Sequence, residues 1–389
     1  MTRNPAGRAP WYSANSSSAP HDRAAEQARR GRKVERYALR SGLWRATGLE
    51  RCRDCGRVAV TPGGSVGVRV VKGGGSGFSG LATCGSVWAC PVCAAKIAAR
   101  RGDELARVLS WAVGEGHTVA MLTLTARHHE RQALSVLWDG VQAAWGAVTS
   151  GRAWQATRDG FGVLGWARAV EVTHGVNGWH PHLHVVLVLE GRVERERVEA
   201  LGAALWPRWE RALERRGLSA LRAPGLDIRA SVGEVRDALA AYLVKALAME
   251  ATAGHGKRGR EGGRAPFQLL ADLVRDGEAR DHALWREWET TSRGRRQLTW
   301  SRDLRALAGM ADEQTDEQIA GEDVEGEDVL VLDAVTWRAV RDEQGALLVA
   351  ADRWGVAGAR AWLRGRGLPW VEPLPGGRGE GLRGRLRRR

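Results

Sequence analysis

The pattern of apolar and polar positions predicts a mixed block of strands and helices between residue 117 and about residue 252. Strand-like runs, in which apolar residues alternate or cluster over short stretches, cover residues 117–126, 163–173, 180–190 and 226–232. Apolar residues at helical spacing predict helices at residues 131–148, 192–213 and 233–250. This order indicates an α+β domain in which helices flank a central antiparallel β-sheet.

The rest of the chain divides by composition. Residues 1–35 are rich in Ser, Ala, Pro and Arg without helical or strand periodicity, so we expect them to be disordered. Residues 36–110 hold the cysteines among Gly-rich turns, and residues 111–253 hold the mixed block. We expect an Arg-rich linker and helical accessory region at 254–310, an acidic linker at 311–328, and a small helical unit with a basic tail at 329–389.

Composition narrows the class of partner. The chain of 389 residues is 43% hydrophobic and carries a formal charge of +14, which indicates a globular protein with a polyanionic partner such as nucleic acid. Nearly all the basic residues are Arg, which a GC-rich genome also imposes, so charge alone is weak evidence. No segment approaches the ~20 apolar residues of a membrane span, and the N-terminus lacks the apolar core of a signal peptide. We therefore expect a cytoplasmic protein.

Three histidines occupy alternate positions at the start of the run 180–190. Side chains alternate faces along a strand, so His180, His182 and His184 share one face while the aliphatic residues between and after them pack on the other. A single histidine of this kind is commonly a satisfied polar residue on an exposed strand face. Three histidines at alternate positions, followed by the apolar residues of a core strand, favour a metal site instead.

Glu171 is the candidate carboxylate ligand for that site. The segment before the histidines predicts a hairpin around Asn177-Gly178. A two-residue turn at this pair places Glu171 opposite His184, and a four-residue loop places it opposite His182. Either register puts the carboxylate on the histidine face. Two imidazoles and one carboxylate suit Mg²⁺ or Mn²⁺, although zinc hydrolases use a similar ligand set, so the ion is less defined than the site.

These motifs resemble a known superfamily. HPHLHVVLV is similar to the His-hydrophobe-His motif of HUH endonucleases, with His182 and His184 as the pair, and MLTLT at 121–125 resembles the strand of their first motif. The most similar branch is the replication initiators of rolling-circle plasmids from Gram-positive bacteria, in their actinobacterial form. The resemblance covers roughly residues 45–310. It implies the HUH endonuclease fold, with the paired histidines and Glu171 around a divalent ion and His180 outside the pair.

Tyr242 is the candidate nucleophile. HUH enzymes cleave single-stranded DNA through a tyrosine on a helix after the histidine strand, and the other tyrosines, Tyr12 and Tyr37, precede the sheet. Lys245 follows at i+3 on the same side of the predicted helix. Because a phenol with a pKa near 10 is mostly protonated at pH 7, a nearby ammonium favours the reactive phenolate. YLVK resembles the family's Tyr-x-x-Lys, but Ala238 stands where related initiators can carry a glutamate that activates water.

Two CxxC motifs predict a structural zinc site. Cys52 and Cys55 form the first pair, and Cys90 and Cys93 form the second; such pairs supply four thiolates to a tetrahedral Zn²⁺. Cys84 is the spare: it can substitute as a ligand or simply be buried, and burial is the simpler interpretation. The Gly-rich and Val-rich segment between the pairs would form the hairpins of a small zinc-ribbon-like module that precedes the sheet domain.

Arginine clusters lie downstream of the predicted catalytic helix. Arg258 and Arg260 lie in the expected linker, and Arg295 and Arg296 lie in GRRQLTWS. Each is a candidate phosphate contact, although each cluster can equally be a solvated face.

The resemblance implies a plasmid replication initiator that nicks one strand at the double-strand origin. Attack by Tyr242 would leave a 5′-phosphotyrosyl link and a free 3′-hydroxyl for a host DNA polymerase, and strands would later be rejoined. A host helicase and single-strand binding protein would act alongside. Two alternatives stay open: an HUH-type transposase, and a non-catalytic zinc-dependent DNA-binding repressor.

Overall fold

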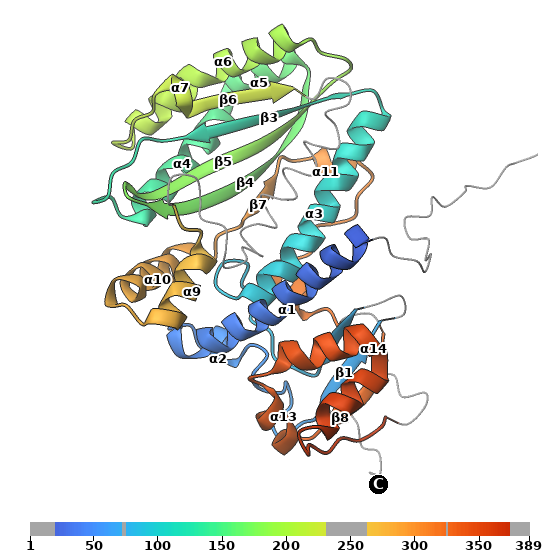
Figure 1. Cartoon of the computed structure of the whole chain (residues 1–389). Coiled ribbons are helices and arrows are strands. Elements are labelled where there is room, and N and C mark those ends of the chain that lie inside the picture. Colours follow the sequence, from blue (N-terminus) through green and yellow to red (C-terminus); the bar gives the residue numbers. More distant parts are fainter. Residues whose placement is uncertain (1–19, 72–74, 231–262, 324–325, 374–389) are drawn as a thin grey trace, which may run out of the picture. The chain divides into compact units, whose positions relative to one another are not determined.

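The computed structural model describes residues 20–71, 75–230, 263–323 and 326–373, which divide into two compact units (Figure 1). The sheet unit comprises residues 39–58 and 82–322. The terminal unit comprises the chain up to residue 38, residues 59–81 and the chain from residue 323 onward. Each unit has its own hydrophobic core. No helix among the described residues has the length and apolar character needed to cross a bilayer.

The sheet unit is built on a five-stranded antiparallel sheet with the order β6-β3-β5-β4-β7. The strands are β3 (Thr118–Thr125), β4 (Val163–Gly175), β5 (Gly178–Leu189), β6 (Leu226–Ala230) and β7 (Leu298–Trp300). The expected α+β class and antiparallel sheet are therefore confirmed. The edge strand β7 corrects the sequence prediction, which placed GRRQLTWS in a helical region. Its backbone pairs with β4 from Ala167 to Ala169.

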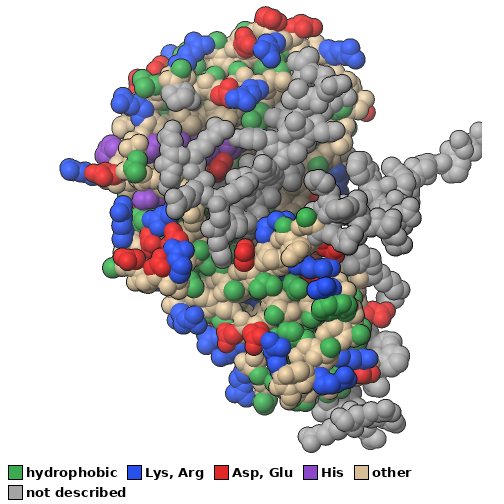
Figure 2. Space-filling view, viewed as in Figure 1, with side chains coloured by type: hydrophobic (Ala, Val, Ile, Leu, Met, Phe, Trp, Pro, Cys, Tyr) green, Lys and Arg blue, Asp and Glu red, His purple; other side chains and the backbone are tan. Residues whose placement is uncertain are grey.

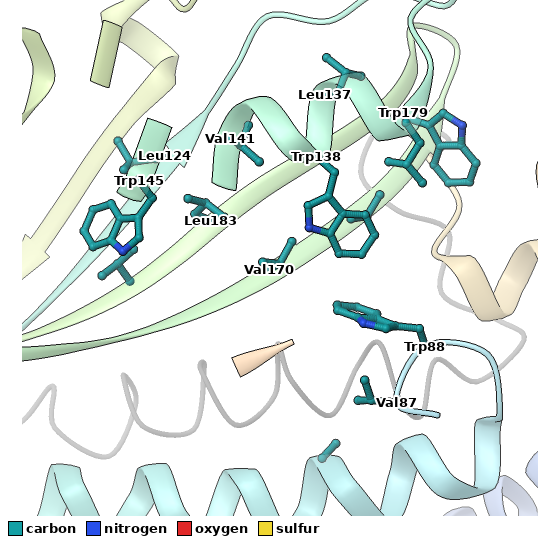
Figure 3. Close-up of a cluster of buried hydrophobic side chains, with 14 of the residues drawn as sticks. Val87, Trp88, Leu124, Leu137, Trp138, Val141, Trp145, Val170, Trp179 and Leu183 are labelled. Atoms are coloured by element: carbon teal, nitrogen blue, oxygen red, sulfur yellow. The ribbon is translucent and has the colours of Figure 1, made fainter. Parts of the chain in front are cut away.

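Helices α4 (Leu134–Val148), α5 (Gly151–Phe161) and α6 (Arg195–Glu214) cover one face of this sheet (Figure 1). Leu124 and Leu183 point to that face and belong to the same core as Trp138 and Trp145 of α4 (Figure 3). Since β3 and β5 alternate strictly, their remaining side chains point to the opposite face.

The opposite face is covered in part by α3 (Pro91–Gly114) and the short helix α11 (Leu304–Leu307). Val186 and Val188 of β5 pack there with Leu105 and Val108 of α3. In the first half of β5, before these valines, the same face carries His180, His182 and His184. The site therefore begins where this apolar core ends.

The sheet unit contains five further helices among the described residues, three of which have six residues or fewer. They are α2 (Glu50–Asp54), α7 (Arg222–Gly225), α9 (Pro266–Asp276), α10 (Ala279–Ser292) and α12 (Asp316–Gly321). Helix α12 lies in the segment 311–328, which the sequence predicted to be an acidic linker. The prediction is wrong for this helix, because buried Arg101 of α3 binds Glu313 and Asp316 and so compensates their charge.

The terminal unit holds a three-stranded antiparallel sheet with the order β2-β1-β8. Its elements are β1 (Val66–Val70), β2 (Ser76–Ser79), β8 (Glu327–Leu332), α13 (Ala334–Val340), α14 (Gln344–Arg364) and the first part of α1 (Pro20–Ala46). The strands β1 and β2 were expected to be hairpins of a zinc-ribbon-like module within 36–110. Instead, Val66 and Val68 share a core with Leu330 and Leu332 of β8, more than 200 residues later in the chain.

Helix α1 begins at Pro20 and so corrects the expectation of disorder for residues 20–35, whereas residues 1–19 lie outside the described residues. Contacts distant in sequence support it. The Lys33 ammonium donates to Asp352 at 2.7 Å, and the Tyr37 ring packs edge-on against Phe78. A pattern confined to residues 20–35 cannot show partners supplied by β2 and α14.

Candidate metal centre on the histidine strand

The structure brings the predicted ligands His182, His184 and Glu171 together. Glu171 of β4 lies directly opposite His182 of β5, and its Oε2 lies 3.0 Å from His182 Nε2 and 2.9 Å from His184 Nε2. The hairpin turns at Val176-Asn177, with Gly175 paired to Gly178. This is the register that the sequence analysis linked to a four-residue loop. The turn nevertheless has two residues, because it lies one position earlier than the expected Asn177-Gly178 pair. Gly178 adopts a φ of 83°, which a side chain disfavours.

The third strand supplies a residue that the sequence analysis did not single out. Thr123 of β3 pairs with His184, and its hydroxyl lies 3.2 Å from His184 Nδ1. A hydrogen bond on one ring nitrogen fixes the orientation of the imidazole and leaves the other nitrogen to face the carboxylate. The available signal was the alternation in MLTLT, which places Thr123 on the face opposite Leu122 and Leu124.

Two further imidazoles extend the row beyond the ligands. The rings of His180 and His128 stack with centroids 4.5 Å apart and planes inclined by 15°. Burial, followed by the neighbouring His182 and His128 rings, lowers the pKa of His180 to about 4. This imidazole is therefore neutral at pH 7 and contributes no positive charge that would repel a cation.

The electrostatics of Glu171 favour its ionised form. Burial acts to raise the pKa of this carboxyl, but the hydrogen bonds and charges of His182 and His184 together outweigh burial and hold the pKa below its ordinary value. The carboxylate side chain is 25% exposed, whereas His184 is 5% exposed. The site is therefore anchored in the protein on one side and open on the other.

The donor set fits a divalent cation. Two imidazole nitrogens and one carboxylate oxygen all lie within 4.8 Å of one another. Such a set leaves coordination positions open for oxygens of water or substrate. Figure 2 shows histidine side chains, in purple, gathered on one face of the molecule.

The predicted nucleophile Tyr242 and its neighbour Lys245 lie outside the described residues, as do Arg258 and Arg260. The described chain stops at Ala230, which pairs with Ala120 of β3, and resumes at Gly263. Arg264 then exchanges two backbone hydrogen bonds with His174 near the tip of the histidine hairpin. Ala230 is thus in the sheet that carries the metal ligands, and Arg264 is bridged to one of its strands, β4.

The two arginines of GRRQLTWS differ in what they contact. The Arg295 guanidinium donates to Asp139 and Gln142, each at 2.8 Å, and lies over the Trp138 ring. This argues against Arg295 as a phosphate contact, because its donors already have partners inside the protein. Arg296 is 69% exposed, with one loose pairing to Glu313 at 3.6 Å. Arg296 thus keeps the exposure that a DNA contact requires.

The cysteines gather in a set that differs from the expected one. The sulfurs of Cys55, Cys84, Cys90 and Cys93 lie within 4.8 Å of one another, and all four residues are buried. Cys84, which was expected to be the spare, stands in place of Cys52. The CxxC spacing favoured Cys52, but spacing does not show which four sulfurs converge. Cys52 lies inside the short helix α2 and outside that group.

Comparisons with known proteins support the resemblance seen in the sequence. A family model described as a replication protein matches residues 82–344. A protein rep of Streptomyces lividans is 32% identical over 354 residues, with 72% of this chain and 77% of that protein covered. A neomycin resistance protein of Streptomyces cyanogenus is 34% identical over 144 residues, which cover 30% of this chain and 33% of that protein. No solved structure matches the chain.

Proposed function

This chain belongs to the replication protein family, and on that premise we propose that it initiates rolling-circle replication of a plasmid by cutting one DNA strand at the origin. The observation that carries the proposal is the convergence of Glu171, His182 and His184 on one face of the sheet. The family match covers the strands that hold these residues, and the expected resemblance to plasmid replication initiators is confirmed.

The three ligands would hold Mg²⁺ or Mn²⁺ beside the scissile phosphate. When bound, the ion withdraws charge from a non-bridging phosphate oxygen and so favours attack at phosphorus. The contribution of the protein is to fix the ligands in advance: β4 and β5 set the distance between carboxylate and imidazoles, and Thr123 orients the His184 ring.

Tyr242 would act as the nucleophile. Its phenol oxygen forms a bond to phosphorus, the 3′-oxygen leaves and takes a proton, and the 5′-phosphate stays linked to the protein. The Lys245 ammonium would stabilise the phenolate. Because one phosphodiester replaces another, the link conserves the bond energy for rejoining strands. The free 3′-hydroxyl would prime a host polymerase, with a host helicase and single-strand binding protein alongside.

The test is a nicking assay with a supercoiled plasmid that carries the chain's own origin. In the presence of Mn²⁺, we expect a nicked product with covalently attached protein. The variant Tyr242→Phe should abolish it, whereas the matched controls Tyr12→Phe and Tyr37→Phe should retain it. His182→Ala and His184→Ala should each reduce cleavage strongly.

The same assay separates the alternatives. A zinc-dependent repressor would bind the origin tightly and leave the plasmid intact. A transposase would cut a transposon end in preference to a plasmid origin. Either outcome would contradict the proposed function.

A further inference from the structure

The four clustered cysteines have the spacing of a metal site. Cys55 Sγ lies 3.5 Å from Cys93 Sγ and 3.7 Å from Cys90 Sγ, and Cys84 Sγ lies 3.7 Å from Cys93 Sγ. Tetrahedral zinc with Zn–S bonds of about 2.3 Å places its sulfurs about 3.8 Å apart. The sulfurs are thus separated by nearly the distance that a shared zinc ion requires, while none of the cysteines forms a disulfide.

The backbone turns that carry these cysteines explain why Cys84 joins the set. Cys55 ends helix α2 and is followed by Gly56 at a φ of 61°, and Cys84 is followed by Gly85 at a φ of 63°. Each Cys-Gly pair thus makes a turn that a side chain at the second position would disfavour. Cys90 caps the start of α3, and Cys93 lies in its first turn. Two similar turns and one helix start therefore present the four sulfurs.

All four converging cysteines are buried. A divalent cation binds cysteines as thiolates with release of their protons, and its charge compensates theirs inside the protein.

We propose that Cys55, Cys84, Cys90 and Cys93 bind a structural Zn²⁺ ion and that Cys52 is not a ligand. Cys52 lies inside helix α2, outside the group of four converging sulfurs to which Cys84 belongs. Both residues line a cavity of about 710 Å³ within the sheet unit, which gives an ion or a chelator a route to the site. The zinc site is independent of the histidine site proposed for cleavage.

The loop between two of these ligands reaches the core of the sheet unit. Trp88 lies between Cys84 and Cys90 and packs edge-on against Trp138 of α4, with ring centroids 5.0 Å apart (Figure 3). It packs in the same way against Trp288 of α10, with ring centroids 5.6 Å apart. The Trp288 indole donates to the Trp88 carbonyl at 3.0 Å. Zinc at the base of this loop would fix Trp88 in that cluster, so loss of zinc should change tryptophan fluorescence.

Metal analysis of matched variants tests the ligand set. We expect about one equivalent of zinc per chain in the purified protein and in Cys52→Ala, but less than half an equivalent in Cys84→Ala. Because Cys84→Ala can also fail to fold, Cys84→His provides a second measurement. A Cys₃His set binds zinc, so this variant should regain the metal and the tryptophan emission of the unmodified chain.

Cobalt gives a spectroscopic measure of the same set. Replacement of zinc by Co²⁺ should produce intense visible bands typical of tetrahedral coordination and a near-ultraviolet sulfur-to-cobalt band, and Cys52→Ala should leave both unchanged. Loss of zinc in Cys52→Ala with retention in Cys84→Ala would overturn the proposal, as would a well-folded chain that binds neither metal. Failure of the plasmid to be nicked would bear only on the histidine site.

Discussion

One carboxylate oxygen contacts both imidazoles of the candidate metal centre, and a threonine hydroxyl holds one of those imidazoles from the other side. Sequence alternation alone was sufficient to place Glu171 on the histidine face, because a shift of two residues does not change the face. It could not choose the register, which depends on where the hairpin turns. It also could not identify Thr123, whose role depends on β3 lying beside β5.

The Thr123 hydroxyl can be tested by removing it without changing the size of the side chain. In Thr123→Val, His184 loses its hydrogen bond, and we expect the Mn²⁺ affinity to fall by about tenfold to 100-fold. Thr125→Val is the matched control, since Thr125 points to the same face and the described residues provide no partner for its hydroxyl. Mn²⁺ binding can be followed by electron paramagnetic resonance. Equal affinities in the two variants would show that Thr123 does not position the ligand.

The neighbouring arginines Arg295 and Arg296 should have opposite phenotypes. Arg295→Ala removes charge-assisted hydrogen bonds and a ring contact, so we expect the free energy of unfolding to fall by about 1 to 3 kcal/mol. Arg296→Ala should leave stability unchanged and weaken origin binding, with a smaller dependence of affinity on salt. Urea unfolding and DNA titrations at several salt concentrations provide the measurements. A stable Arg295→Ala chain with weakened DNA binding would reverse the assignment.

At the scale of elements, the strands and helices with strong periodicity were predictable, and the errors occur where distant partners decide the outcome. β3, β4, β5 and α6 lie close to their predicted ranges. The acidic segment was taken for a linker because like charges repel, yet α12 forms there against α3. Arg101 of α3 binds Glu104, Glu313 and Asp316 at 3.0 to 3.2 Å, and its side chain is 7% exposed. A basic residue more than 200 positions earlier therefore compensates the acidic charge.

This interaction predicts a large difference between two adjacent arginines. Arg101→Ala leaves buried Glu104 with Arg305 as its partner and removes the buried cation beside half-buried Glu313 and Asp316, so we expect a loss of about 3 kcal/mol in the free energy of unfolding. Arg100 is 42% exposed, and its guanidinium lies 4.0 Å from Glu104, which is the outer limit of an ion pair. Arg100→Ala should therefore lower the free energy of unfolding by less than about 1 kcal/mol. Chemical unfolding of both variants is the measurement. Similar losses in the two would show that the α3–α12 contact contributes little.

At the scale of the whole molecule, the chain builds its terminal unit from three separate segments. The sequence analysis divided the chain into consecutive domains, because composition changes mark boundaries but cannot reveal that a segment pairs with a distant strand. Val66 and Val68 lie in the first third of the chain and pack against Leu330 and Leu332 near its end. The terminal unit is thus closed only when β8 has been synthesised.

Separate cores predict separate responses to mutation. Leu330 is fully buried in the terminal unit, so Leu330→Ala should destabilise that unit by about 2 to 5 kcal/mol and leave the sheet unit and plasmid nicking intact. Val335 is 67% exposed and provides a control in Val335→Ala. Hydrogen exchange resolved by peptide distinguishes the units. Equal loss of protection in both units would show that they unfold as one.

The central claim is that the ion held by Glu171, His182 and His184 and the phenol of Tyr242 act on the same phosphate. The most direct measurement is to trap the protein–DNA adduct formed in Mn²⁺, digest it with trypsin and identify the linked residue by mass spectrometry. The account predicts a nucleotide on Tyr242 in the peptide DALAAYLVK, and no adduct when His182 and His184 are both replaced by Ala. Linkage through Tyr12 or Tyr37, or an undiminished adduct without the two histidines, would contradict it.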